Sequence, residues 1–183
     1  GHNVACPHEA ETFMSSTRSA LRAIFVTLAL VLLATQLHAQ SGLGSITFPT
    51  SASAQAQPAF LTGVKALHNF QFDEAAVAFR EAQKLDPTFA LAYWGEAMSH
   101  NHPLWGEQNL EAASKALARL APTHAERLAK AKLPKEKALL EAQQELFWGT
   151  GDKLARDIAY SKAMARMHEQ WPDDHEIATF YAL

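Results

Sequence analysis

The residues with the most evident chemistry are histidines in the middle of the chain. His100, Asn101 and His102 follow one another, and His68 precedes them. Imidazole nitrogens are common ligands of transition metals. On a helix, side chains two residues apart point about 200° away from each other, so His100 and His102 chelate one ion only where the backbone leaves helical geometry. Pro103 favours that departure at the residue before it. Because no cysteine and no evident carboxylate complete the shell, we predict no metal site.

The sequence carries no recognisable catalytic motif. It has no nucleophile motif, no phosphate-binding glycine loop and no His-Glu-x-x-His helix, and Glu96 and Glu107 have no evident partners. We therefore predict no catalytic residue and no cofactor. One alternative stays open, in which the chain is the N-terminal part of a metal- or ligand-dependent enzyme whose catalytic residues lie beyond Leu183.

Composition indicates one globular domain without a nucleic-acid partner. Hydrophobic residues make up 48% of the 183 residues and charged residues 19%, which is typical of a folded protein. The formal net charge of -3 gives no basic surface for nucleic acid. The single cysteine, Cys6, cannot form an internal disulfide.

Residues 14–39 have the order of a secretory signal peptide. Arg18 and Arg22 precede an apolar run over residues 23–34, and Ala39 supplies a small residue for cleavage. The apolar run is shorter than the roughly 20 residues that a membrane-spanning helix needs. We therefore predict an exported protein, periplasmic or secreted, with no membrane span after cleavage. An uncleaved N-terminal anchor is the alternative.

The remaining boundaries follow from composition. The chain begins with Gly, and Met14 has the position of a start of translation, so residues 1–13 are interpreted as upstream read-through or residues added by cloning. Residues 40–56 are small, polar and rich in Gly and Pro, which is typical of a linker. Residues 57–183 then form the folded domain.

A helical repeat runs through residues 57–183. With Ala56 as position 1 of a 34-residue unit, the sequence matches the tetratricopeptide consensus, in which small residues stand where two helices approach closely and aromatic residues fill the space beside them. A second unit starts at Ala90. The matching positions are Gly63, Phe72, Ala75, Phe79, Ala82 and the helix-terminating Pro87 in the first unit, and Tyr93 and Ala97 in the second.

Hydrophobic periodicity and capping residues predict the rest of the domain. The fold class that follows is all-α, an α-solenoid of antiparallel helix pairs with about three pairs plus one unpaired helix. The expected elements are a long structured turn between Ser99 and Asn109, a helix with an apolar stripe from Leu110 to Leu120, a polar joint after Pro122, a helix from about Leu133 that ends at Gly149, a helix capped by Asp152 that stops at Trp171, and a last helix after Asp173 and Asp174.

Several stretches together resemble a largely uncharacterised family of exported bacterial tetratricopeptide-repeat proteins. Its members are longer than this chain, so the resemblance implies an N-terminal fragment. It also implies a helical-repeat fold and an exported location, and it supplies no catalytic residue. A protein or peptide partner is expected for such a fold. The stretches that carry it are residues 46–51, 67–75, 89–98, 101–105, 172–174 and 180–183.

The resemblance also implies where a ligand binds. In such repeats the first helix of each pair lines a concave face, and His68 and His102 occupy the same repeat position, about 8–10 Å apart across neighbouring helices. The candidate ligand-binding residues are His68, Trp94, Met98, Asn101, His102 and Trp105. A structural alternative stays open, in which His68 is a core histidine, His102 closes a turn, and Trp94 and Trp105 pack between repeats. The predicted function is a binding or scaffold module that recognises a protein, peptide or small ligand on its concave face.

Overall fold

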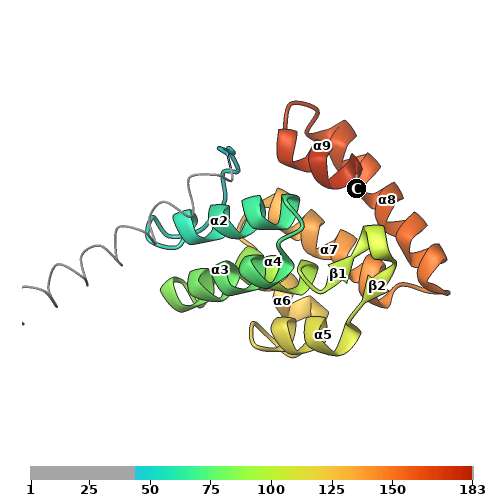
Figure 1. Cartoon of the computed structure of the whole chain (residues 1–183), viewed down its shortest axis with the longest axis horizontal. Coiled ribbons are helices and arrows are strands. Elements are labelled where there is room, and N and C mark those ends of the chain that lie inside the picture. Colours follow the sequence, from blue (N-terminus) through green and yellow to red (C-terminus); the bar gives the residue numbers. More distant parts are fainter. Residues whose placement is uncertain (1–43, 183) are drawn as a thin grey trace, which may run out of the picture. The chain divides into compact units, whose positions relative to one another are not determined.

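The structure is a computed structural model that describes residues 44–182. The predicted residues 1–13, the predicted signal peptide at 14–39 and the start of the predicted linker lie outside the described part. Within it, eight α-helices, one 3-10 helix and a two-stranded hairpin make a mostly helical fold, so the all-α prediction is confirmed (Figure 1). No helix of this part is long and apolar enough to cross a membrane.

In order, the elements are α2 (Gln57–His68), α3 (Phe72–Leu85), α4 (Ala90–Met98), β1 (Asn101–His102), η1 (Pro103–Trp105), β2 (Glu107–Gln108), α5 (Leu110–Ala118), α6 (His124–Lys130), α7 (Pro134–Trp148), α8 (Lys153–Gln170) and α9 (His175–Ala182).

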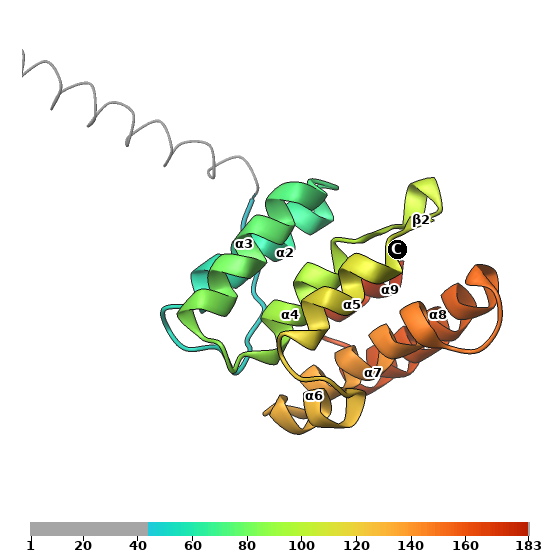
Figure 2. The same ribbon diagram turned by 90° about the horizontal axis from the view of Figure 1, so that it is seen from below.

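Most helices that are neighbours in sequence also contact each other. The most extensive contacts join α2 with α3, α3 with α4, α4 with α5, and α7 with α8 (Figure 2). The Phe79 ring of α3 lies between α2 and α4. A Cβ atom added at Gly63 would come within 2.7 Å of this ring, and one added at Gly95 within 2.3 Å. Glycine at both positions therefore lets the three helices approach closely.

A buried carboxylate ties three helices together. Glu96 of α4 accepts hydrogen bonds from Gln83 Nε2 at 2.6 Å and from Arg80 at 3.3 Å, both on α3. Arg119, which follows α5, also pairs with Glu96. Because a buried charge needs compensating partners, this network has a structural role.

The segment before α2 belongs to the same folded unit. Phe48 is buried, with its ring centroid 5.5 Å from that of Phe60 on α2. Glu136, which is fully buried at the start of α7, accepts hydrogen bonds from the backbone N–H of Ser51 at 2.7 Å and from its hydroxyl at 2.8 Å. These contacts attach residues 48–51 of the predicted linker to the helices.

Several helix ends follow their predicted signals. Helix α3 ends at Leu85, two residues before Pro87. Asp152 accepts a hydrogen bond from the Ala155 N–H at 2.9 Å and caps α8, and Asp174 accepts from two N–H groups at the start of α9. The expected long turn between Ser99 and Asn109 contains the β1–η1–β2 hairpin.

Helix α6 was not predicted. The stretch after Pro122 was expected to be a polar joint, but Thr123 and Glu126 form a capping box that starts a seven-residue helix. Glu126 Oε2 accepts from the Thr123 hydroxyl at 2.7 Å, and the Glu126 N–H donates to Thr123 Oγ1 at 3.3 Å. The Thr-x-x-Glu spacing was the available signal in the sequence.

Candidate functional site

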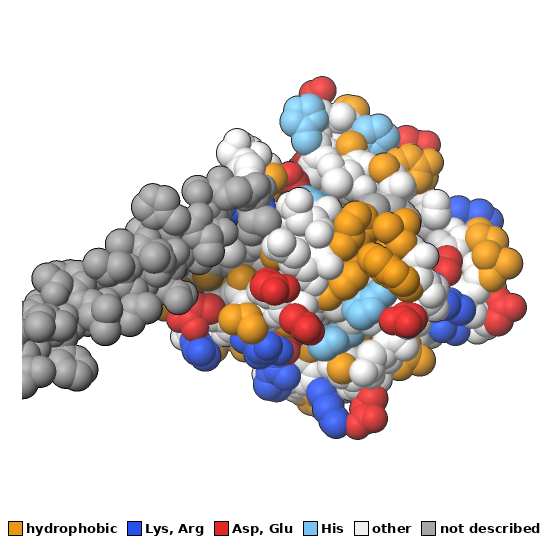
Figure 3. Space-filling model, viewed as in Figure 1, with side chains coloured by type: hydrophobic (Ala, Val, Ile, Leu, Met, Phe, Trp, Pro, Cys, Tyr) orange, Lys and Arg blue, Asp and Glu red, His pale blue; other side chains and the backbone are white. Residues whose placement is uncertain are grey.

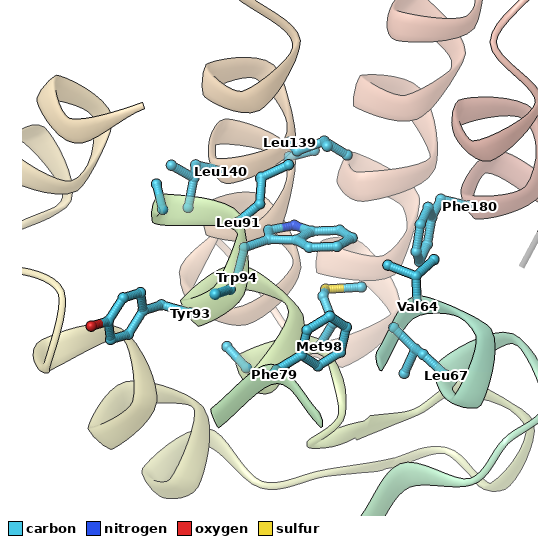
Figure 4. Close-up of a cluster of buried hydrophobic side chains, with 14 of the residues drawn as sticks. Val64, Leu67, Phe79, Leu91, Tyr93, Trp94, Met98, Leu139, Leu140 and Phe180 are labelled. Carbon is cyan, nitrogen blue, oxygen red and sulfur yellow. The ribbon is translucent and has the colours of Figure 1, made fainter. Parts of the chain in front are cut away.

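Helix α9 covers two of the predicted ligand-binding residues. His68 Nε2 lies 2.7 Å from Glu176 Oε2 of α9, and its ring packs against Phe180 with a centroid distance of 4.8 Å. Trp94 is fully buried, and Phe180 meets its indole edge-on at 5.1 Å (Figure 4). Both side chains therefore contact the protein itself, as in the structural alternative.

His102 has different surroundings from His68. It stacks on Phe72 with a centroid distance of 4.1 Å, and its Nε2 lies 3.2 Å from the Ser99 carbonyl oxygen. Its Nδ1 lies 3.4 Å from Glu107 Oε2. The two histidines share none of these partners. Within residues 44–182, no three His, Cys, Asp or Glu side chains are arranged to hold a metal ion.

One hollow of the described part is a cavity of about 370 Å³, which we call the apolar cavity. The predicted residues Met98 and Asn101 line it, together with side chains from α2, α7, α8 and α9. Its polar groups include the Lys153–Asp157 ion pair, whose opposite charges offset each other at 2.7 Å. Its wall consists of Leu67, Phe70, Phe72, Met98, Asn101, Pro103, Leu146, Lys153, Asp157, Tyr160, Ser161, Phe180, Tyr181 and Ala182.

Gln108 fixes the hairpin beside this cavity. Its Nε2 donates to Asn101 Oδ1 at 3.0 Å and to the Leu146 carbonyl of α7 at 3.3 Å. Arg156 of α8 donates to Gln108 Oε1 at 3.2 Å. One side chain thus holds the hairpin against two helices that form the cavity wall.

Two aromatic side chains of this cavity, Phe70 and Phe72, contact further aromatic rings outside it. Trp105 meets Phe70 and Phe72 edge-on, each at 6.1 Å, and is 59% exposed. We call Phe70, Phe72, His102 and Trp105 the aromatic ridge. With Leu104, which is 66% exposed, Trp105 belongs to an exposed hydrophobic surface. A hydrophobic patch bordered by histidines is visible in Figure 3, with acidic side chains on either side (Figure 3).

Phe70 holds its place on this ridge through a strained backbone. It has φ of 59°, in the left-handed region that favours glycine. The Phe70 N–H donates to the Leu67 carbonyl at 3.1 Å, and the Gln71 N–H donates to Ala66 at 2.9 Å. This is the Schellman arrangement at the end of α2, with phenylalanine at the position where glycine is usual. Such strain is concentrated at functional sites, so Phe70 is a candidate that the sequence did not reveal.

A second hollow lies on the other side of Phe72. We call it the acidic cavity because Asp73 and Glu107 line it and no Lys or Arg does. His100 and His102 also line it, and burial lowers the pKa of His100 below its ordinary value of 6.5. Strand β1 separates the two hollows, since successive strand residues point to opposite faces. Asn101 accordingly lines the apolar cavity and His102 the acidic one.

Tyr160 forms part of the apolar cavity wall and has a buried hydroxyl. Its oxygen has no hydrogen-bond partner among the described residues, and burial raises its pKa above the ordinary value of 10.0. The phenol is therefore neutral at physiological pH. His68 Nδ1 and Trp94 Nε1 are also buried without a partner in this part of the chain.

Comparison with protein-family models, with curated proteins and with solved structures finds no match for this chain. The geometry of the site is therefore the basis for a functional proposal.

Proposed function

We propose that the domain is a tetratricopeptide-type solenoid that acts as an exported binding or scaffold module for a protein, peptide or small ligand. The repeat register from Ala56 supports the solenoid, as does the packing of α2 with α3, α4 with α5 and α7 with α8. Helix α9 then stands where a fourth unit would begin, against α8.

The observation that carries the proposal is the apolar cavity. Its volume of about 370 Å³ is within the range of about 300–1,000 Å³ that is usual for ligand sites. The exposed ring of Trp105 and the partly buried rings of Phe70 and Phe72 provide apolar contact area with little conformational entropy to lose on binding. Its wall combines hydrophobic side chains with polar ones such as Asn101, Tyr160 and Ser161, and such polar groups fix the orientation of a bound ligand. In this proposal the ligand contacts Met98, Asn101 and the aromatic ridge. It does not contact His68 and Trp94, which α9 covers.

Two adjacent positions on α8 allow a direct test. Ser161 lines the cavity and is exposed, whereas Lys162 is exposed and is not part of the wall. Peptides selected from a phage-displayed library against the wild-type domain are the probe. Ser161→Trp should weaken their binding at least tenfold, because the indole fills the cavity mouth, and Lys162→Trp should leave it unchanged. Equal binding by both variants would contradict the proposal.

Export is a separate part of this proposal. It rests on the signal-peptide pattern of residues 14–39. The mass of the protein recovered after expression in a bacterial host with a secretory pathway tests it. We expect the mature chain to begin at or near Gln40, and a chain that keeps residues 14–39 would favour the uncleaved anchor.

A further inference from the structure

The two cavities together have the chemistry of a site for one kind of peptide. Building on the proposed function, we propose that the ligand is an extended peptide with an apolar side chain in the apolar cavity and a lysine or arginine, two residues away, in the acidic cavity.

The first argument is that the cavities are adjacent and share a wall. Phe72 lines both, and His102, stacked on Phe72 at 4.1 Å, lines the acidic cavity. In an extended peptide, side chains two residues apart point to the same face and lie about 7 Å apart. Two side chains of one peptide can therefore enter the two cavities on either side of the Phe72–His102 stack.

The second argument is charge. Asp73 and Glu107 give the acidic cavity two carboxylates, and the two histidines on its wall are its only basic side chains. The lowered pKa of His100 keeps that ring neutral at pH 7. Asp73 has no hydrogen-bonded or ion-paired cation within the described residues, and Glu107 reaches only His102, at 3.4 Å. A cationic side chain would thus find two carboxylates that no Lys or Arg in this part of the chain neutralises.

The third argument is the difference in net charge between the cavities. In the apolar cavity the Lys153 ammonium lies 2.7 Å from Asp157, so these charges offset each other. Leu67, Met98 and Phe180 supply hydrophobic wall area. An apolar group and a cation are therefore favoured at different, fixed places.

Isothermal titration with synthetic peptides tests the proposal. The parent probe is acetyl-Ala-Phe-Ala-Arg-Ala-amide, and its relatives carry Gln or Glu in place of Arg, or Ala in place of Phe. With wild-type protein at low ionic strength, we expect the Gln peptide to bind about 2- to 5-fold more weakly than the parent, as exposed charge pairs allow. The Glu peptide should be weaker still. The Arg preference should shrink as salt is added.

Protein variants assign the effect to the acidic cavity. The double variant Asp73→Asn with Glu107→Gln should bind the Arg and Gln peptides equally. The control is Glu74→Gln with Glu111→Gln, which removes the same charge from exposed positions outside both cavities. This control should keep the Arg preference.

The outcomes separate this inference from the function on which it rests. In one outcome, the Phe-containing peptides bind and Ser161→Trp blocks them, but the Arg and Gln peptides bind equally. The proposed need for a Lys or Arg side chain is then overturned, while the binding function stands. If no peptide binds the wild-type protein, and the phage library yields no binder, both are overturned.

Discussion

Replacing Tyr160 by Phe should change stability in the opposite direction to replacing Tyr93 by Phe, because only the Tyr93 hydroxyl has a hydrogen-bond partner among the described residues. Removing a buried polar group that has no partner removes its desolvation penalty, which is about 1–3 kcal/mol. Tyr160→Phe keeps the ring and its packing, so we expect the free energy of unfolding to rise by about 1 kcal/mol. Tyr93 is the control, because its hydroxyl donates to the Pro87 carbonyl at 3.1 Å. Tyr93→Phe loses that bond and should lower the free energy of unfolding by about 0.5–1 kcal/mol, as Pro87 is exposed and its carbonyl can bind water instead.

Urea denaturation followed by circular dichroism at 222 nm measures both variants. With a slope of about 2 kcal/mol per molar urea, a gain of 1 kcal/mol moves the midpoint up by about 0.5 M. The slopes should match that of the wild type, so that midpoints compare stabilities directly. At pH 7 both phenols are neutral, since burial raises the pKa of Tyr93 as well as that of Tyr160. If Tyr160→Phe is destabilised as Tyr93→Phe is, the Tyr160 hydroxyl has a hydrogen-bond partner and the reasoning fails.

Three further predictions concern packing, backbone strain and pH. Gly95→Ala should lower the free energy of unfolding by about 1–3 kcal/mol, because the added methyl overlaps the Phe79 ring. Thermal melts of the double variant Gly95→Ala with Phe79→Leu should show part of that loss restored. Phe70→Gly should be about 1 kcal/mol more stable than Phe70→Ala in urea, because glycine adopts φ of 59° without strain, and equal stabilities would refute this. The lowered pKa of His100 means that the unfolded chain binds a proton first as pH falls, so stability should decline from about pH 6.5 downward. His100→Gln should show a smaller decline in melts between pH 7 and 5, and an identical pH profile would count against burial of that ring.

Local signals predicted much of the fold. Pro87, Asp152 and Asp174 act within one helical turn of the helix ends that they set, so their effects can be read from neighbouring residues. The repeat consensus predicted that two helices approach closely at Gly63. The Phe79 ring of α3 does lie close to Gly63 of α2. Thr123 and Glu126 show the opposite case. Their Thr-x-x-Glu spacing is a helix-start signal, yet this stretch was predicted to be a polar joint.

The candidate site was less predictable because it depends on contacts between distant residues. His68 and Glu176 are 108 positions apart, and nothing near His68 indicates that α9 will cover it. Trp94 and Phe180 are also far apart in sequence, and nothing near Trp94 indicates that Phe180 of α9 will contact it. Met98 and Asn101, which the repeat rule gave as ligand-binding residues, line the apolar cavity, and the same rule also selected the buried Trp94. The left-handed backbone of Phe70 has no signal in its residue type, which normally avoids that conformation.

The central claim is that ligands bind in the apolar cavity, and methionine methyl NMR tests it most directly. Met98 lines this cavity, whereas Met164 and Met167 are buried in α8 and are not part of its wall. With 13C-labelled methionine methyl groups, titration of a phage-selected peptide should shift the Met98 resonance and leave those of Met164 and Met167 in place. Shifts at Met167 with an unchanged Met98 would place the ligand elsewhere and contradict the claim.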